Sequence, residues 1–249
     1  MTTARTALVT GASRGIGAAV ARALSAEGYV VAVHYSSSGA AAQAVHAELD
    51  GDGHVVVRAD LRDPDQVRQM VDEAAAALGG IDVLVNNAGV FFAHPIDAVD
   101  YQTWQEAWRE TLDVNLVGPA NTTWCAVRHM GPGGRVINIG SRGAFRGEPH
   151  SPAYGASKAA IAAFGQSLAK YLGARGIAVT TIAPGFVETD MATEALAGEG
   201  GVVRRAESPF NRVATTDDIA AAVVYLASPE AEWASGGILD LNGASYLRM

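Results

Sequence analysis

The sequence contains one cysteine, Cys125, and only two lysines, Lys158 and Lys170. A single cysteine cannot form a disulfide within the chain, which is typical of a reducing compartment, so we expect a cytoplasmic protein. We interpret Cys125 as a small apolar group on a helix. Acidic residues outnumber basic ones by 26 to 18, and the formal net charge is −8. Without a basic cluster, we expect no nucleic-acid partner.

Long hydrophobic segments are also missing. No apolar run approaches the roughly 20 residues of a membrane span. Residues 1–6 lack the apolar stretch of a signal peptide, and strand-like residues follow at once. We therefore expect no membrane association and no export, and we expect no metal site. Apolar residues still make up 49% of the chain, which predicts a large buried core.

Short apolar runs alternate with helical stretches along the whole chain. Strands are predicted over 7–9, 29–33, 54–59, 81–85, 135–139, 177–182 and 237–241. Helices are predicted over 18–26, 40–49, 64–78, within 104–130, 152–173 and 217–226. This alternation is typical of a parallel sheet with helices on both faces. We predict an α/β fold, a single-domain Rossmann-like doubly wound sheet over 1–249, with a lid over about 184–211.

The segment Thr10–Gly17 reads Thr-Gly-Ala-Ser-Arg-Gly-Ile-Gly and joins the first strand to the first helix. A helix start has unpaired N–H groups and a partial positive charge, which a pyrophosphate can use if no side chain blocks its approach. Gly11 would make the turn, Gly15 would admit the phosphate and Gly17 would let the helix pack closely. The spacing differs from Gly-x-Gly-x-x-Gly, so this segment alone is equally consistent with a structural turn.

Six predicted strands end in polar or glycine-rich residues. In a parallel sheet these ends meet at one rim, where ligands bind. Each residue alone can be an ordinary turn residue, but together they indicate a cofactor cleft. Beyond the glycine segment, the rim comprises His34, Tyr35, Ser36, Asp60, Leu61, Asn87, Ala88, Gly89, Ser141, Pro184 and Gly185.

The end of the second strand bears on the choice of dinucleotide. NAD-preferring enzymes usually place an acid about 20 residues after the glycine segment, where it binds the ribose hydroxyls. Here His34, Tyr35 and Ser36 occupy that region without a carboxylate. Hydroxyl groups tolerate a 2′-phosphate, and Arg14 can supply positive charge to it. We predict NADP rather than NAD; in the alternative interpretation Arg14 is solvated and His34 only ends a strand.

Tyr154 and Lys158 lie four residues apart on a predicted helix and therefore share one face. A free phenol has a pKa of about 10, and a nearby cation lowers it toward neutrality. The alternative is a surface pair. Ser141 follows a strand and can bond a substrate carbonyl oxygen. Asn115 lies inside a helix, which asparagine disfavours; it marks either a kink with bound water near Lys158 or a satisfied core amide.

In order and spacing, these motifs resemble the short-chain dehydrogenase/reductase family of the one-domain type. The resemblance extends from Thr10 to Gly243 and covers nearly the whole chain. The motifs that carry it are Thr10–Gly17, Asp60-Leu61, Asn86–Gly89, Asn115, Ser141, Tyr154-x-x-x-Lys158 and Pro184-Gly-Phe-Val-Glu-Thr189.

The resemblance implies roles for these residues. Tyr154 would be the general acid in reduction and the general base in oxidation. Lys158 would lower the pKa of Tyr154 and hold the nicotinamide ribose, Ser141 would orient the carbonyl, and Asn115 would hold a water linked to Lys158. Asp60 would contact the adenine. The other implied cofactor contacts are Gly11, Ser13, Arg14, Gly15, Ile16, Gly17, Leu61, Asn87, Ala88 and Gly89, then Pro184 and Gly185, with Val187 and Thr189 at the nicotinamide amide.

Within the family, Thr10–Gly17 and Pro184–Met191 are similar to 3-oxoacyl-[acyl-carrier-protein] reductases. Arg175 matches a basic position that such enzymes use for the carrier. A second basic position falls near Pro132-Gly133, where Arg128 or Arg135 would have to substitute. The family also implies a homotetramer formed through the helices within 104–130 and over 152–173. The residues expected near the substrate are Phe145, Arg146, His150, Phe186 and Met191, of which the last two are alternatively packing residues of the lid.

The function predicted from the sequence is hydride transfer between NADP(H) and a small carbonyl or alcohol compound. A first alternative is a dedicated 3-oxoacyl-[acyl-carrier-protein] reductase. A second is a cofactor-sensing regulator without turnover. Such regulators usually lose the tyrosine or the lysine, whereas Tyr154 and Lys158 are both present here.

Overall fold

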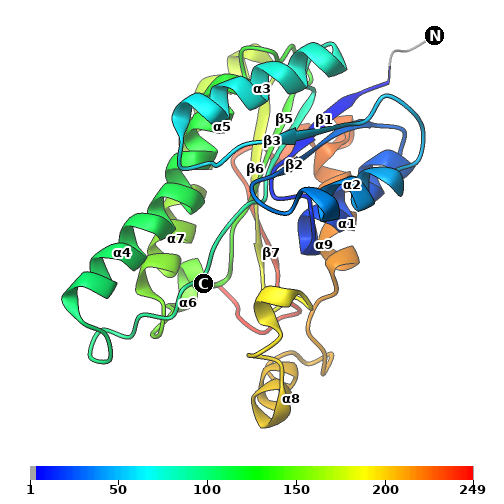
Figure 1. The fold of residues 1–249 in the computed structure, drawn as a ribbon. Helices are drawn as coiled ribbons and strands as arrows, with labels where there is room; N and C mark the ends of the chain where they lie inside the picture. The colour runs from blue at the N-terminus through cyan, green and yellow to red at the C-terminus, as the bar shows by residue number, and fades with distance from the viewer. Residues whose placement is uncertain (1–3, 249) are drawn as a thin grey trace.

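A computed structural model describes residues 4–248. Its centre is a seven-stranded sheet in which all neighbouring strands run parallel (Figure 1). In spatial order the strands are β3 (Val55–Arg58), β2 (Val30–Tyr35), β1 (Thr6–Val9), β4 (Val83–Asn86), β5 (Arg135–Ile139), β6 (Ala178–Pro184) and β7 (Ile238–Leu241). The chain thus starts near the middle of the sheet and winds outward in both directions, which confirms the doubly wound α/β fold predicted from the sequence.

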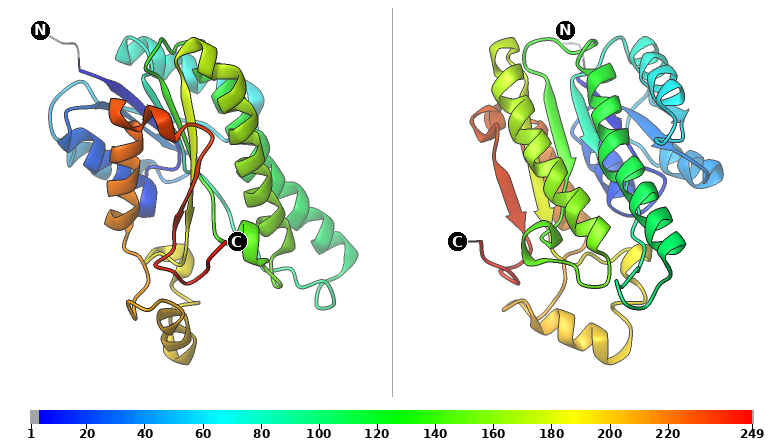
Figure 2. Two further views of the ribbon diagram at one scale, coloured as in Figure 1. Left: turned by 180° about the vertical axis from the view of Figure 1, so that it is seen from behind. Right: turned by 90° about the vertical axis from the view of Figure 1, so that its left-hand side faces the viewer.

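Helices cover both faces of the sheet (Figures 1 and 2). One face carries α1 (Gly15–Ala26), α2 (Gly39–Ala47) and α9 (Thr216–Ala227); the other carries α3 (Pro64–Leu78), α4 (Tyr101–Leu112), α5 (Gly118–Ala126) and α7 (Pro152–Leu172). Side chains alternate along each strand, so Ala7 and Val9 join the first core and Leu8 the second. Burial on both faces explains the continuous apolar strands of the sequence.

Helix α3 shows how local sequence fixes an element. Asp63 accepts hydrogen bonds from the N–H groups of Asp65 and Gln66, and Pro64 occupies the first turn, where its missing N–H costs nothing. The helix ends at Gly79, whose φ of +79° is the left-handed conformation that glycine adopts easily. The predicted range 64–78 is therefore confirmed.

The helical segment within 104–130 is not one regular helix. A π turn over Asp113–Val117 separates α4 from α5, and Asn115 lies inside it. The proposed lid is also more regular than predicted, because it contains a short 3-10 turn (Asp190–Ala192) and the helix α8 (Gly198–Ala206), which projects below the sheet in Figure 1. A four-residue helix, α6 (Gly143–Arg146), follows β5 and was not predicted.

The remaining elements are the 3-10 turns at Gly173–Arg175 and Pro229–Ala234. Within residues 4–248, none of the helices has the length and apolar character needed to cross a bilayer.

Candidate active site

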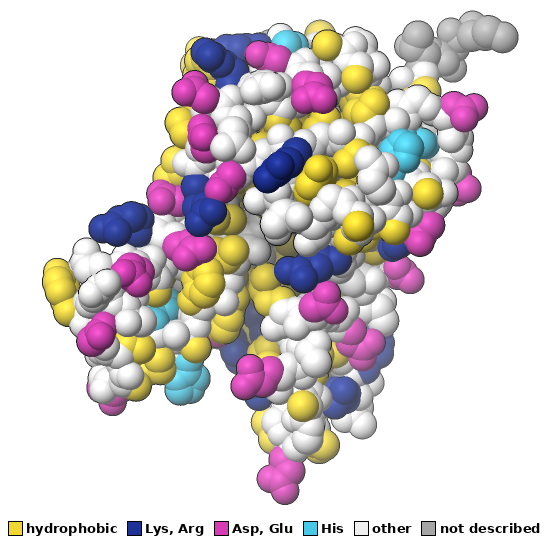
Figure 3. Space-filling model, in the orientation of Figure 1, with side chains coloured by type: hydrophobic (Ala, Val, Ile, Leu, Met, Phe, Trp, Pro, Cys, Tyr) yellow, Lys and Arg dark blue, Asp and Glu magenta, His cyan; other side chains and the backbone are white. Residues whose placement is uncertain are grey.

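The carboxyl ends of the strands open toward a notch between the end of α4 and the projection formed by α8 (Figure 3). The residues predicted from the strand ends lie along this edge. They comprise the glycine segment with its neighbours at the ends of β2, β3, β4 and β6, and the predicted catalytic residues after β5, in the π turn and at the start of α7.

The glycine segment forms a cradle with the geometry expected for a phosphate. Gly11 and Gly15 have φ values of +64° and +57°, which L side chains rarely adopt. A Cβ at Gly17 would collide with the carbonyl oxygen of Gly11 and lie 2.5 Å from Asn87 Nδ2. Helix α1 starts at Gly15 with no side-chain cap from Arg14 and no acidic residue in its first turn. The first-turn N–H groups and the helix dipole are thus available to an anion, so this segment fits a dinucleotide pyrophosphate.

The end of β4 is tied to the end of β1. Thr10 Oγ1 accepts hydrogen bonds from the N–H groups of Asn87 and Ala88, at 3.0 and 3.1 Å. Asn87 Nδ2 donates in return to the carbonyl oxygens of Thr10 and Gly11, at 2.8 and 3.2 Å. The side-chain amide of Asn87 therefore stabilises the glycine turn itself.

The structure places His34 beneath the cradle rather than on its surface. We expected His34 and Tyr35 to follow the second strand, but β2 extends to Tyr35, and the His34 side chain is buried. Its Nδ1 accepts from the Gly11 N–H at 3.0 Å, so Nε2 carries the proton and donates to the Ala59 carbonyl oxygen at 3.1 Å. Burial lowers the pKa of His34 to about 4. This neutral imidazole holds the turn and brings no positive charge to a phosphate.

The other cofactor positions line the same edge. Ser36 is exposed just beyond β2, and Arg14 is exposed on the glycine segment, with its Nη1 3.9 Å from the Asp190 carboxylate of the lid. Asp60 accepts hydrogen bonds from Arg62, which lowers the pKa of its carboxyl group. Across the cradle, Thr189 approaches Gly15, and Val187 is buried. The remaining predicted contacts, Ser13, Ile16, Leu61, Gly89, Pro184 and Gly185, lie on the same segments.

Tyr154 and Ser141 form a hydrogen-bonded pair. Ser141 Oγ accepts from the Gly143 N–H at 3.0 Å, which leaves its O–H free to donate to the Tyr154 oxygen. Burial raises the pKa of Tyr154 to about 12; the Ser141 hydrogen bond opposes this shift, and the charge of Glu148 adds to it. The prediction that the pKa of Tyr154 lies below its usual value is therefore wrong. Desolvation outweighs the other influences on the phenol.

Lys158 lies near the Tyr154 ring but does not lower the pKa of the phenol. Its ammonium is buried and donates a 2.8 Å hydrogen bond to the carbonyl oxygen of Ile139, while Nζ lies 5.7 Å from the centre of the Tyr154 ring. The influences on the pKa of the phenol do not include the charge of Lys158. Burial also lowers the pKa of Lys158 itself to about 8. The same face of α7 does hold both groups, as their spacing predicts.

Asn115 is a satisfied amide within the π turn. Its Oδ1 accepts from the Val90 N–H at 2.8 Å, and its Nδ2 donates to the Val90 carbonyl oxygen at 3.0 Å and to Ser157 Oγ at 3.2 Å. A Cβ at Gly89 would lie 3.2 Å from Asn115 Oδ1 and 3.6 Å from Lys158 Nζ. The satisfied amide, one of the two alternatives, is confirmed, and it lies in a π turn beside the lysine, whereas the bound water of the other alternative stays a prediction.

The buried Lys158 predicts a pH-dependent stability. Between pH 8 and 10.5 the unfolded chain binds a proton that the folded chain has lost, so the free energy of unfolding rises with pH in this window. Substituting Lys158→Met removes this linkage. The stability of the variant relative to wild type should fall by on the order of 3 kcal/mol from pH 7 to pH 10.5.

Urea denaturation at several pH values measures this difference. Lys170→Met, at an exposed position of the same helix, is the matched control and should differ from wild type by a constant amount. A Lys158→Met difference that does not change with pH would show that the ammonium carries no burial cost.

Sequence reasoning missed three residues around Tyr154. The Phe91 ring packs edge-on against Tyr154 with 5.1 Å between ring centres. His94 is buried; its Nδ1 donates to the Phe92 carbonyl oxygen, and its Nε2 accepts from the Ala153 N–H, which fixes the start of α7. Glu148 lies next to Gly143. The only signal in the sequence was that Glu148 is the one acid within 142–150.

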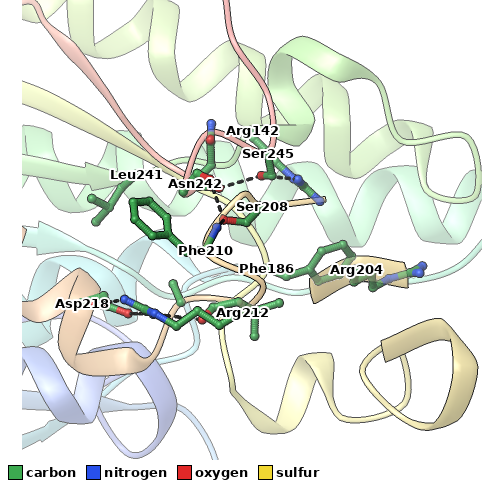
Figure 4. Close-up of a pocket in the computed structure, with 13 residues that line it drawn as sticks. Arg142, Phe186, Arg204, Ser208, Phe210, Arg212, Asp218, Leu241, Asn242 and Ser245 are labelled. Atoms are coloured by element: carbon green, nitrogen blue, oxygen red, sulfur yellow. Dashed lines mark hydrogen bonds and ion pairs between the residues drawn. The ribbon is translucent and has the colours of Figure 1, made fainter. Parts of the chain in front are cut away.

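The lid is attached to the segment after β5 by a group that we call the arginine cluster: Arg142, Arg146, Arg204, Phe186 and Glu207. Arg142 is buried and donates to Glu207 and to Ser245. The guanidinium carbons of Arg142 and Arg204 lie 5.1 and 4.9 Å from the centre of the Phe186 ring (Figure 4). A cavity of about 150 Å³ adjoins this cluster, but none of the four predicted catalytic residues lines it.

The residues expected near the substrate are dispersed. Phe186 belongs to the arginine cluster, in line with its alternative as a packing residue. The Phe145 ring lies under Arg248, with 4.4 Å between the guanidinium carbon and the ring centre. Met191 and His150 are exposed. Arg146 forms an ion pair with Glu148, with 3.7 Å between Nε and Oε1.

The basic residues considered for a carrier protein differ in access. Arg135 is buried and donates to the carbonyl oxygens of Gly133 and Gly134, so of the two possible substitutes only Arg128 remains a candidate for contact with a carrier. Arg175 donates to the Val127 carbonyl oxygen at 2.6 Å at an exposed position. Arg128 is stacked on Trp124.

Comparison with known proteins places this geometry in a family. The family model described as enoyl-(acyl carrier protein) reductase matches residues 11–243. The chain belongs to the short-chain dehydrogenase/reductase family. An uncharacterized oxidoreductase of Methylorubrum extorquens is 39% identical over 245 residues, which cover 96% of each chain. The 3-oxoacyl-[acyl-carrier-protein] reductase of Staphylococcus aureus is 37% identical over 98% of each chain.

A solved short-chain dehydrogenase from Burkholderia cenocepacia, in complex with NADP, superimposes with a TM-score of 0.88 and 39% identity, over 97% of each chain. The likeness therefore extends over the entire fold of this short-chain dehydrogenase/reductase.

Proposed function

We propose that this short-chain dehydrogenase/reductase transfers a hydride between NADP(H) and a carbonyl or alcohol compound, with Tyr154 as the general acid and base. The observation that carries the proposal is that the Lys158 ammonium lies 5.7 Å from the centre of the Tyr154 ring on the same face of α7, with the Ser141 hydroxyl close enough to lower the pKa of the phenol. The uncapped start of α1 and the glycine cradle fit the pyrophosphate of the dinucleotide. NADPH, when bound, supplies the hydride.

The protein residues handle the proton. A phenol with a pKa of about 12 keeps its proton at neutral pH, so Tyr154 is ready to donate it to the oxygen of a carbonyl that is being reduced. Ser141 holds that oxygen and stabilises the charge that develops on it. Lys158, the buried cation on the same helix face, is the group that would bond a ribose hydroxyl of the dinucleotide. These features favour reduction as the direction of the reaction at neutral pH.

The preference for NADP over NAD rests on Arg14 and Ser36, and on the absence of a carboxylate at the end of β2. We expect Arg14→Gln to lower kcat/KM for NADPH by about tenfold to a hundredfold, the usual worth of a charge-assisted hydrogen bond. The value for NADH should change little. Arg22→Gln, on the exposed side of α1 in an ion pair with Glu48, is the matched control. Equal losses with both dinucleotides would contradict the role of Arg14.

We also propose the cellular compartment, the oligomeric state and a second candidate substrate. The protein acts in the cytoplasm, as its single cysteine indicates. It assembles as a homotetramer through α4 and α7, which lie side by side in Figure 2. Reduction of a 3-oxoacyl group on acyl carrier protein is the second candidate function, favoured by the similarity to the Staphylococcus aureus enzyme and by the exposed Arg175. With Arg135 buried, the free small carbonyl compound is the first candidate.

A screen of NADPH oxidation tests the function. The panel contains acetoacetyl thioesters, aldehydes, cyclic ketones, small aliphatic ketones, sugars and quinones. We expect turnover with at least one free carbonyl compound. Oxidation with none of them would contradict the proposal and favour a cofactor-sensing regulator.

A further inference from the structure

Glu148 lies between the two backbone segments that hold Ser141 and Tyr154, with its carboxylate against Gly143 and its Cβ near Gly155. A Cβ at Gly143, two residues after Ser141, would collide with Glu148 Oε1 and lie 2.8 Å from its Cγ. A Cβ at Gly155, next to Tyr154, would lie 3.6 Å from Glu148 Cβ. Only a residue without a side chain at position 143 leaves room for the carboxylate in this position.

This carboxylate is poorly satisfied by the protein. Its side chain is only 19% exposed, and its one ion pair, with Arg146, spans 3.7 Å between Oε1 and Nε. Among residues 4–248, no hydrogen bond reaches either carboxylate oxygen, although a carboxylate accepts about four. Arg146 also faces Glu207 at 3.7 Å, so its charge is shared. The carboxylate is thus partly exposed and keeps acceptor capacity that a donor on a ligand can use.

The chemistry of the site identifies that ligand. Glu148 packs against Gly143, two residues after Ser141, and against Gly155, next to Tyr154, so it lies beside the catalytic pair, and its charge raises the pKa of the Tyr154 phenol. A substrate whose carbonyl oxygen is held by Ser141 and Tyr154 presents its neighbouring carbon atoms to the space beside this pair. We propose that Glu148 is a specificity residue that selects carbonyl compounds with a hydrogen-bond donor, a hydroxyl or an ammonium group, close to the carbonyl.

The inference rests on the proposed carbonyl reduction. Three ketones of nearly equal size distinguish a failure of this inference from a failure of the proposed function. Butan-2-one has no donor, 1-hydroxypropan-2-one has a hydroxyl, and protonated 1-aminopropan-2-one has an ammonium group. We expect kcat/KM for each donor-bearing ketone to exceed that for butan-2-one by about tenfold to a hundredfold, as for a hydrogen bond to a charged acceptor.

Three variants test whether the Glu148 carboxylate causes the preference for donor-bearing ketones. Glu148→Met, similar in size and without an acceptor, should bring both ratios close to one. Glu148→Gln keeps an acceptor without the charge, so it should lose the ammonium preference and keep part of the hydroxyl preference. Gly143→Ala leaves Glu148 in the chain but displaces its carboxylate, so it should act like Glu148→Met. Glu106→Gln, at an exposed position of α4, should leave both ratios unchanged.

The outcomes separate the two proposals. If the wild type reduces no carbonyl compound of the panel or of this series, the proposed function fails. If it reduces ketones without preferring a donor, or reduces only donor-free carbonyl compounds, the role of Glu148 is overturned while the function stands. Ratios that survive both Glu148→Met and Gly143→Ala would overturn it as well.

Discussion

Replacing Tyr154 by phenylalanine should lower kcat/KM for carbonyl reduction by about 10²- to 10⁴-fold, the usual contribution of a positioned general acid. The ring keeps its edge-on contact with Phe91, and only the hydroxyl is lost, together with its hydrogen bond to Ser141. The effect should therefore fall on turnover and leave the binding of NADPH unchanged. Steady-state kinetics, together with a fluorescence titration of NADPH, measures the two separately.

Tyr171→Phe is the matched control, because Tyr171 lies on the same helix with an exposed side chain. It should keep wild-type turnover. Two results would contradict the account: wild-type turnover in Tyr154→Phe, which would remove the phenol from the chemistry, or a loss of NADPH binding large enough to explain the whole effect.

Replacing Gly17 by alanine should weaken NADPH binding by more than about tenfold, or 1.4 kcal/mol, because the new methyl group displaces the turn that receives the pyrophosphate. The methyl group would collide with the Gly11 carbonyl oxygen and press on the Asn87 amide, which itself bonds the turn. Overpacking of this kind should also lower the free energy of unfolding by about 1–3 kcal/mol.

Gly131→Ala provides the control for the glycine substitution, because a Cβ there meets no atom within 4 Å and no unusual backbone angle is involved. It should change neither affinity nor stability. Calorimetric titration with NADPH and urea denaturation measure both effects. A Gly17→Ala protein with wild-type affinity would mean that the phosphate does not bind at the start of α1.

Much of the fold was predictable because the hydrophobic pattern of the strands and the residues at helix ends agree with the way the elements pack. The strands are buried on both faces and read as continuous apolar runs, and Asp63, Pro64 and Gly79 mark the ends of α3 in the sequence itself. The positions of Ser141 and the Tyr154–Lys158 pair followed from strand ends and helix spacing, which do not depend on distant contacts. Helix α8 was missed because glycine at 198, 200 and 201 makes its first turn a poor helix former.

The errors in the site have physical causes of another kind. The predicted second strand ended two residues early, which moved His34 from the core to the rim. The pKa of Tyr154 was predicted from its neighbour Lys158, but burial is the largest influence on the pKa of each group. The place of Glu148 depends on how the segment over 142–150 folds back on Gly143, and no local pattern encodes that contact.

The most direct test of the central claim follows the hydride itself. The panel of carbonyl compounds is incubated with NADPH that carries deuterium in the transferable position, and the alcohol product is analysed by mass spectrometry. The account predicts one deuterium on the former carbonyl carbon with the wild-type enzyme, and at most a trace of labelled alcohol with Tyr154→Phe. Alcohol formed without deuterium, or no labelled alcohol from any compound, would contradict it.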